Sequence, residues 1–122
     1  MGMAWIVEMV DEFREWLDSL DLATRVGVLA AVIVLGEEGP SLGRPLVDVV
    51  KGSRYANMKE LRPPTPDRQT IRVLFAFDPL RQAVLLVGGD KANDWMKWYK
   101  RNIPLADERF ERYLTDLEIG RR

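Results

Sequence analysis

The spacing of hydrophobic and polar residues divides this chain into helical and extended segments. Near the start, apolar residues recur at helical spacing, at Val10, Phe13, Leu17 and Leu20. This pattern predicts an amphipathic helix from about Val10 to Leu20. Asp21 is a good N-cap for a second helix, predicted from about Leu22 to Leu35 and ended by Gly36. The second helix is apolar on most of its surface, which indicates that it is well buried.

The middle of the chain predicts three short strands in succession, at Asn57–Leu61, Thr70–Phe77 and Ala83–Gly88. All three are rich in β-branched or apolar residues and are bounded by Pro, Gly or Asp. Asp78-Pro79 is a turn signal, and the short link predicts an antiparallel hairpin between the last two strands. Trp5–Glu8 is a further possible strand at the start.

The remaining segments complete the expected order, β-α-α-β-β-β-α-α. Ser41–Ala56 has the Gly and Pro content of a loop. Asn93 or Asp94 can cap a third helix with the sequence DWMKWYKR, and Pro104 is predicted to begin a last helix. We therefore expect an α+β fold, in which a small antiparallel sheet packs against the two N-terminal helices. We also expect residues 1–122 to form a single domain.

Composition narrows the class of protein. The chain has 122 residues, 47% of them hydrophobic and 30% charged, which is typical of a soluble globular protein. The longest apolar run, Val26–Leu35, is too short to span a membrane, and no secretory signal is visible, so we expect a cytoplasmic protein. With no cysteine and no histidine, the chain lacks disulfides, thiolate metal ligands and the usual general base.

The formal net charge of −1 hides an asymmetry. Residues 1–40 hold 2 basic and 8 acidic residues, a balance of −6. Residues 41–101 hold 12 basic and 6 acidic residues, a balance of +6. A basic middle in a nearly neutral chain suggests a local anion-binding face.

The predicted hairpin places specific basic residues together. Antiparallel strands bring the start of one strand beside the end of its partner. Arg62, Arg72 and Lys91 are therefore expected to converge at one end of the sheet, whereas Arg81 belongs to the other end. Lys59 lies two residues before the convergent end and could reach it if it is on the right face.

Three sequence motifs, in a particular order and at a particular spacing, resemble those of a known family. They are KELR at residues 59–62, IRVLF at residues 71–75, and LLVGGDK at residues 85–91 followed by Trp95, Trp98 and Tyr99. The chain resembles the RelE/ParE superfamily of type II toxins, and more closely its HigB-like, phage-derived branch. The resemblance implies a RelE-like fold and a ribosome-dependent endoribonuclease that cuts mRNA in the ribosomal A site. It also implies a basic site without metal or cofactor, and a cognate antitoxin, usually a helix-turn-helix protein.

The resemblance also implies roles for individual residues. Arg72 and Lys91 match the family's basic positions, and Lys59 and Arg62 match them less firmly. The aromatic side chain that stacks on a base would be Trp98 or Tyr99. Two basic residues of the preceding loop, Lys51 and Arg54, are further candidates to bind RNA. The chain departs from some HigB members in lacking histidine, which leaves the proton-transfer step without a named residue.

These residue types suit RNA cleavage by the RNA's own 2′-hydroxyl. Arginine matches phosphate oxygens bidentately and stays charged, so it can stabilise the charge of the transition state. A lysine whose pKa is lowered by cationic neighbours can act as acid or base near neutral pH. Glu60 can act as a base or form a salt bridge. An aromatic side chain can hold a splayed base by stacking.

Structural explanations and other functions remain open at this stage. Basic residues at strand ends are often only solvated charge, and Trp95 and Trp98, three residues apart, can serve the core. On the same fold, a ParE-like toxin would bind DNA gyrase and would not need convergent basic groups. A non-enzymatic module that only binds its antitoxin is a further alternative.

Overall fold

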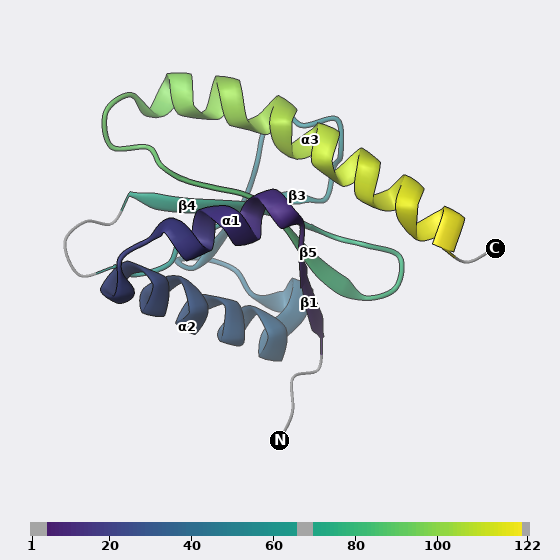
Figure 1. Cartoon of the computed structure of the whole chain (residues 1–122), viewed down its shortest axis with the longest axis horizontal. Helices are drawn as coiled ribbons and strands as arrows, with labels where there is room; N and C mark the ends of the chain where they lie inside the picture. The colour runs from purple at the N-terminus through teal and green to yellow at the C-terminus, as the bar shows by residue number, and fades with distance from the viewer. Residues whose placement is uncertain (1–4, 66–69, 121–122) are drawn as a thin grey trace.

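The structure, a computed structural model, describes residues 5–65 and 70–120 and has an α+β architecture (Figure 1). Within these residues, five strands form one mixed sheet in the order β1-β5-β4-β3-β2. The strands are β1 (Ile6–Met9), β2 (Val47–Val49), β3 (Met58–Leu61), β4 (Ile71–Phe77) and β5 (Gln82–Asp90). The helices are α1 (Asp11–Ser19), α2 (Leu22–Glu38), the short 3-10 helix η1 (Gly39–Ser41) and α3 (Trp95–Gly120).

Helices cover both faces of the sheet, with α1 and α2 on one face and α3 on the other (Figure 1). Two adjacent glycines of β5 mark these faces. A Cβ on Gly88 would come within 2.2 Å of the Trp16 ring of α1, and a Cβ on Gly89 within 2.5 Å of the Trp98 ring of α3. Successive strand residues point to opposite faces, so glycine at both positions lets one indole from each helix lie directly against the strand.

The expected α+β class and the antiparallel hairpin of β4 and β5 are confirmed. The sheet has a fifth strand, β2, within the segment expected to be a loop, where Val47–Val49 pairs antiparallel with β3. Three residues are too few to show an alternating pattern, which explains why this strand was missed. The predicted first strand is present, but it pairs parallel with β5, so the sheet is mixed rather than antiparallel.

The second helix begins as predicted, with the Asp21 side chain accepting a hydrogen bond of 2.8 Å from the Thr24 amide. It continues through Gly36 and ends at Glu38, where Gly39 takes a positive φ of 62°. The expectation that this helix is well buried is only half correct. One side packs into the core, and the other side, which includes Val26 and Ile33, is exposed.

The expectation of two C-terminal helices is wrong, because α3 is one helix with Pro104 inside it. Pro104 removes the hydrogen bond to the carbonyl of Lys100. Both residues are exposed, so water can satisfy that carbonyl. A continuous buried stripe on both sides of Pro104 packs the helix against the sheet, through Trp98, Ile103, Ala106 and Phe110.

No helix in the described ranges is both long and apolar enough to cross a membrane.

Candidate nucleic-acid site at one end of the sheet

Three basic side chains, Arg62, Arg72 and Lys91, gather at one end of the sheet on the face covered by α3; we call them the basic cluster. Leu61 pairs with Val73, so Arg62, the next residue, follows beside Arg72. Arg72 pairs with Gly89, whose face carries α3, and the Lys91 amide donates to the Thr70 carbonyl at 3.1 Å. The predicted convergence of these three residues is therefore present in the fold.

The three basic side chains lie close enough for the two arginines to affect the pKa of Lys91. Burial, together with the positive charges of Arg72 and Arg62, lowers the pKa of Lys91 below its ordinary value, against an opposing effect of Glu60. Arg72 is partly buried, and its Nη1 donates to the Ile71 carbonyl at 2.9 Å. A lysine held in this way is a better proton donor than a free lysine.

Glu60 is the buried anchor of the site, with only 4% of its surface exposed. Its Oε2 accepts hydrogen bonds from Nε and Nη2 of Arg62 at 2.9 and 2.7 Å. Its Oε1 accepts a hydrogen bond of 2.5 Å from the Tyr99 hydroxyl of α3. Asp48 of β2 adds a second carboxylate, 3.2 Å from Arg62 Nη2. Arg62 is thus fixed by two acids from neighbouring strands.

The aromatic residues of α3 lie beside the cluster. Lys91 Nζ is 5.9 Å from the centre of the Trp95 ring and 6.0 Å from the centre of the Tyr99 ring. Burial, with the hydrogen bond to Glu60, raises the pKa of Tyr99 to about 12. The Tyr99 hydroxyl therefore stays protonated at neutral pH and remains a donor to Glu60.

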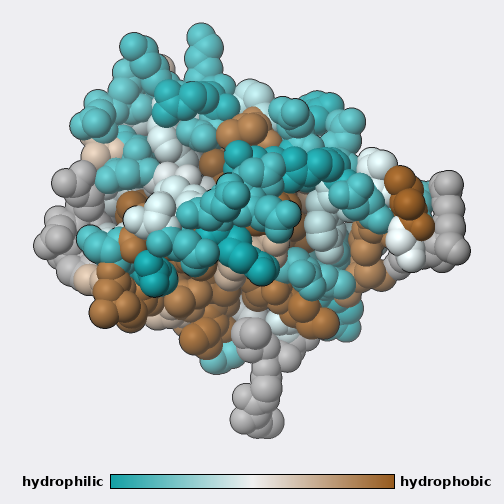
Figure 2. Space-filling view, viewed as in Figure 1, coloured by the Kyte–Doolittle hydropathy of each residue, from teal (hydrophilic) through white to brown (hydrophobic). Residues whose placement is uncertain are grey.

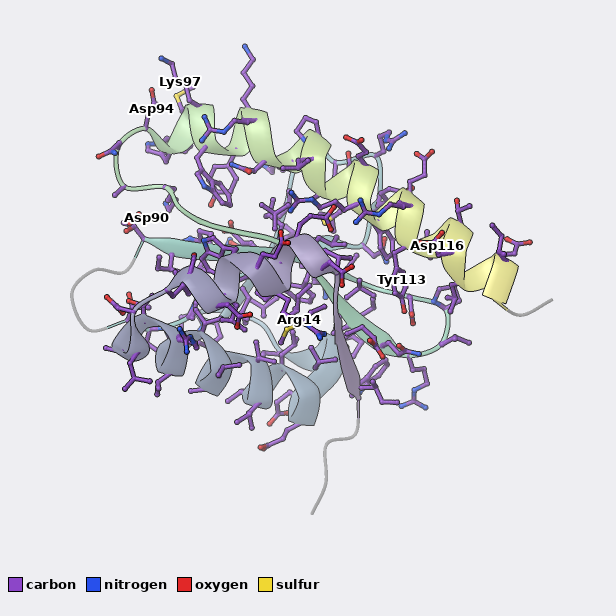
Figure 3. All side chains as sticks on the ribbon, in the orientation of Figure 1. Arg14, Asp90, Asp94, Lys97, Tyr113 and Asp116 are labelled. Carbon is purple, nitrogen blue, oxygen red and sulfur yellow. The ribbon has the colours of Figure 1, made fainter. Side chains whose placement is uncertain are left out.

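A groove of about 250 Å³ opens beside the cluster. It is lined by Val49, Val50, Lys51, Glu60, Trp95, Tyr99 and Ile103. Trp95 is 57% exposed, so its ring is available for stacking. Figure 3 shows Asp90, Asp94 and Lys97 at this end of the molecule, where β5 leads into α3, and Tyr113 and Asp116 at the far end of the helix.

Three side chains expected to serve the site are engaged in other contacts. Lys59 points to the opposite face, where its Nζ is 3.5 Å from the Pro40 carbonyl and 5.7 Å from the Phe77 ring centre. Alternation along β3 explains this, because Glu60 and Arg62 occupy the other face. Arg54 pairs with Glu111 at 2.8 Å.

The third such residue is Trp98, which is only 5% exposed and packs against Gly89 as a core residue. Trp95 is the exposed aromatic instead, and its helical i, i+4 spacing with Tyr99 is the signal that could have identified it. Asp48 gave no comparable signal, because its strand was not predicted. Arg81 lies at the opposite end of the hairpin, as expected, with its guanidinium 4.6 Å from the Trp5 ring centre.

The described part of the chain contains no group of three or more acidic side chains arranged to hold a metal ion.

Comparison with known proteins identifies relatives that match most of the chain. The model of the family "Phage derived protein Gp49-like (DUF891)" matches residues 15–111. The chain is 50% identical over 117 residues to "Putative toxin HigB2" of Mycobacterium tuberculosis, covering 96% of this chain and 58% of that protein. It is 49% identical over 114 residues to "Putative toxin HigB3" of the same organism, covering 93% of this chain and 97% of that protein. The chain thus spans little more than half the length of the first relative and nearly all of the second.

Among solved structures, the chain is similar to a chain of the toxin–antitoxin complex RelBE2 from Mycobacterium tuberculosis. The TM-score is 0.46 and the sequence identity 20%, over 76% of this chain and 98% of that chain. The assignment depends on the sequence matches, which cover most of the chain at about half identity. This chain therefore belongs to the Gp49-like family of phage-derived proteins, together with the HigB-type toxins that it resembles.

Proposed function

We propose that this chain is the toxin of a type II toxin–antitoxin system and that it cleaves mRNA on the ribosome. One observation carries the proposal: Arg62, Arg72 and Lys91 lie together beside a groove that presents an exposed tryptophan. Such a site offers charge for a phosphate and an aromatic face for a base. We further propose that residues 1–122 act as one toxin domain in the cytoplasm, where its substrate is translated.

The proposed reaction needs no protein nucleophile. The 2′-hydroxyl of the RNA loses its proton to water while its oxygen attacks the adjacent phosphorus, and the bond from phosphorus to the 5′-oxygen breaks. The products are a 2′,3′-cyclic phosphate and a 5′-hydroxyl. Arg62 and Arg72 stabilise the negative charge that develops on the phosphoryl oxygens. Lys91, with its lowered pKa, donates the proton that the departing 5′-oxygen requires.

The groove supplies the RNA contacts. Trp95 and Tyr99 form an edge-to-face pair with ring centres 6.3 Å apart, and Trp95 offers its exposed ring to a base. Lys51 lies on the same groove and can bind the RNA backbone. We assign the RNA contacts to these residues rather than to Arg54 or Trp98, whose side chains are engaged elsewhere.

The proposed partner is a cognate antitoxin of the helix-turn-helix type. Two relatives at about half identity are named as toxins of the HigB series, and the resemblance in the KELR, IRVLF and GGDK motifs supports the same partner. Expression of the toxin alone should therefore arrest growth, and expression together with its antitoxin should restore it.

Mapping of RNA 5′ ends after induction tests this function. Cuts should appear within translated frames and should vanish when translation initiation is blocked. Intact mRNA in growth-arrested cells contradicts the nuclease. DNA damage without RNA cleavage instead supports a gyrase-directed toxin.

A further inference from the structure

The exposed side of α2 carries a row of large apolar residues, here named the apolar stripe. Its members and exposed fractions are Leu22 (72%), Val26 (56%), Leu29 (36%) and Ile33 (54%). Figure 2 shows apolar surface gathered along the lower edge of the molecule, where α2 lies in Figure 1. The stripe lies on the sheet face opposite the basic cluster, so the proposed RNA site does not use it.

The stripe is not a by-product of core packing. The core side of the same helix is formed by other residues, Val28, Ala31, Val32 and Leu35. A contiguous apolar patch that solvent contacts usually marks a binding surface. The members of the stripe are spaced by four, three and four residues, which is the a/d spacing of a coiled-coil seam. This spacing fits a helix as the occupant.

The charges around the stripe select the kind of helix. Asp18 and Asp21 lie exposed at its start, and Glu37, one turn beyond Ile33, lies exposed at its end. Arg25 is the basic residue nearest the start, and its guanidinium donates to the carbonyls of the α1 terminus, including Leu20 at 2.9 Å. The stripe is therefore bounded by acidic side chains at both ends.

This arrangement disfavours two other occupants. In a second copy, an antiparallel pairing sets Asp21 against Glu37, and a parallel pairing sets each acid against itself. Both pairings juxtapose like charges, which costs affinity. An anionic lipid surface meets the same repulsion. A helix with basic residues at both ends is complementary in shape and charge.

We propose that the apolar stripe binds an amphipathic helix of a partner protein that carries Lys or Arg at both ends. If the proposed function holds, the antitoxin supplies this helix, and only that identification rests on the proposed function. Because the stripe and the basic cluster occupy opposite faces, a helix bound here leaves the groove beside Trp95 uncovered.

The test uses the purified full chain and two blocked synthetic peptides of about three heptads with identical apolar a and d positions. One peptide carries Lys at both ends and the other carries Glu. In fluorescence anisotropy, the Lys peptide should bind saturably and at least about tenfold more tightly than the Glu peptide, as several exposed ion pairs together give. Val26→Glu and Ile33→Glu should each abolish binding.

Charge reversal gives a variant that leaves the apolar surface intact. Glu37→Lys should weaken binding of the Lys peptide and strengthen binding of the Glu peptide. Equal binding of both peptides, or binding of neither, overturns the proposal. A dimer of the chain in sedimentation equilibrium that Ile33→Glu converts to monomer overturns it in favour of self-association. Because the assay contains no RNA or ribosome, its result is independent of whether the chain is a nuclease.

Discussion

The Tyr99 hydroxyl donates a hydrogen bond of 2.5 Å to Oε1 of Glu60 and so ties helix α3 to strand β3. The other oxygen of the same carboxylate accepts two hydrogen bonds from Arg62. Glu60 is almost fully buried, so these three donors balance a charge that would otherwise be costly to bury. One carboxylate thus holds an aromatic residue of the helix and a cation of the sheet in a fixed relation.

This relation predicts that Tyr99→Phe lowers the free energy of unfolding by about 1.5–3 kcal/mol, the worth of a hydrogen bond to a charged group. Urea denaturation measures the change. The matched comparison is a double-mutant cycle with Glu60→Gln, in which the two effects should be non-additive by more than about 0.5 kcal/mol. Additive effects would mean that the Tyr99 hydroxyl and Glu60 do not stabilise one another.

Cleavage should depend on the basic cluster. Arg72→Ala and Lys91→Ala should each lower the cleavage rate by roughly 10²–10³-fold, the usual effect of losing one contact to transition-state charge. Primer extension on a translated message measures the rate, and circular dichroism verifies the fold. Arg81→Ala is the control, because Arg81 lies at the other end of the hairpin against Trp5. If Arg81→Ala is as inactive as Arg72→Ala, the cluster is not the site.

The mechanism predicts cleavage that survives EDTA once the magnesium requirement of the ribosome is met separately. Attack by the 2′-hydroxyl also requires that a message with a 2′-deoxy or 2′-O-methyl group at the cut position resists cleavage. End-group analysis of the products should find a 5′-hydroxyl. A 5′-phosphate, or efficient cutting of the 2′-deoxy message, would mean that water is the attacking group.

Gly89→Ala should weaken the packing of α3 on the sheet beside the basic cluster. The added Cβ would lie 2.5 Å from Nε1 of Trp98, so the indole or the strand must move. Overpacking of this kind costs about 1–3 kcal/mol, measurable as a lower urea midpoint. Gly43→Ala is the control, because a Cβ there meets no atom within 4 Å. Equal midpoints for Gly89→Ala and the unmodified chain would mean that Trp98 adjusts without strain.

Acid stability should depend on Glu12, whose pKa is lowered to about 2 by hydrogen bonds from Arg112 at 2.7 Å. The folded-state value lies below the ordinary value of 4.5, so this pair stabilises the fold above pH 4.5. That stabilisation should disappear as the pH falls from 4.5 towards 2. Glu12→Gln should therefore show a smaller loss of stability over this range in urea titrations at a series of pH values.

Glu15→Gln is the comparison for this experiment, since Glu15 is an exposed acid on the same helix. It should retain the acid dependence of the unmodified chain. If Glu12→Gln loses as much stability as the unmodified chain when the pH falls from 4.5 towards 2, the pair with Arg112 does not contribute to stability in solution.

The sequence by itself determined the α+β class, the first helix, the β4–β5 hairpin and the meeting of Arg62, Arg72 and Lys91. These features are local or follow from strand direction. The spacing of hydrophobic residues identifies a helix or a strand, and an antiparallel hairpin fixes which strand ends meet. The resemblance to the family could be seen in the sequence for the same reason: each motif is a continuous stretch of chain that lies on one of the paired strands.

Tertiary structure alone decided the features that depend on packing between distant segments. The alternation along β3 could be seen in the sequence. Only the position of α3 shows which face carries the basic cluster, and Lys59 lies on the other face. Likewise, only the contact of Trp98 with Gly89 shows that Trp95 is the exposed ring. The apolar period of α2 could not separate its buried side from its exposed side, because both sides are equally apolar. What covers a surface is set by its neighbours in space, and those neighbours are remote in sequence.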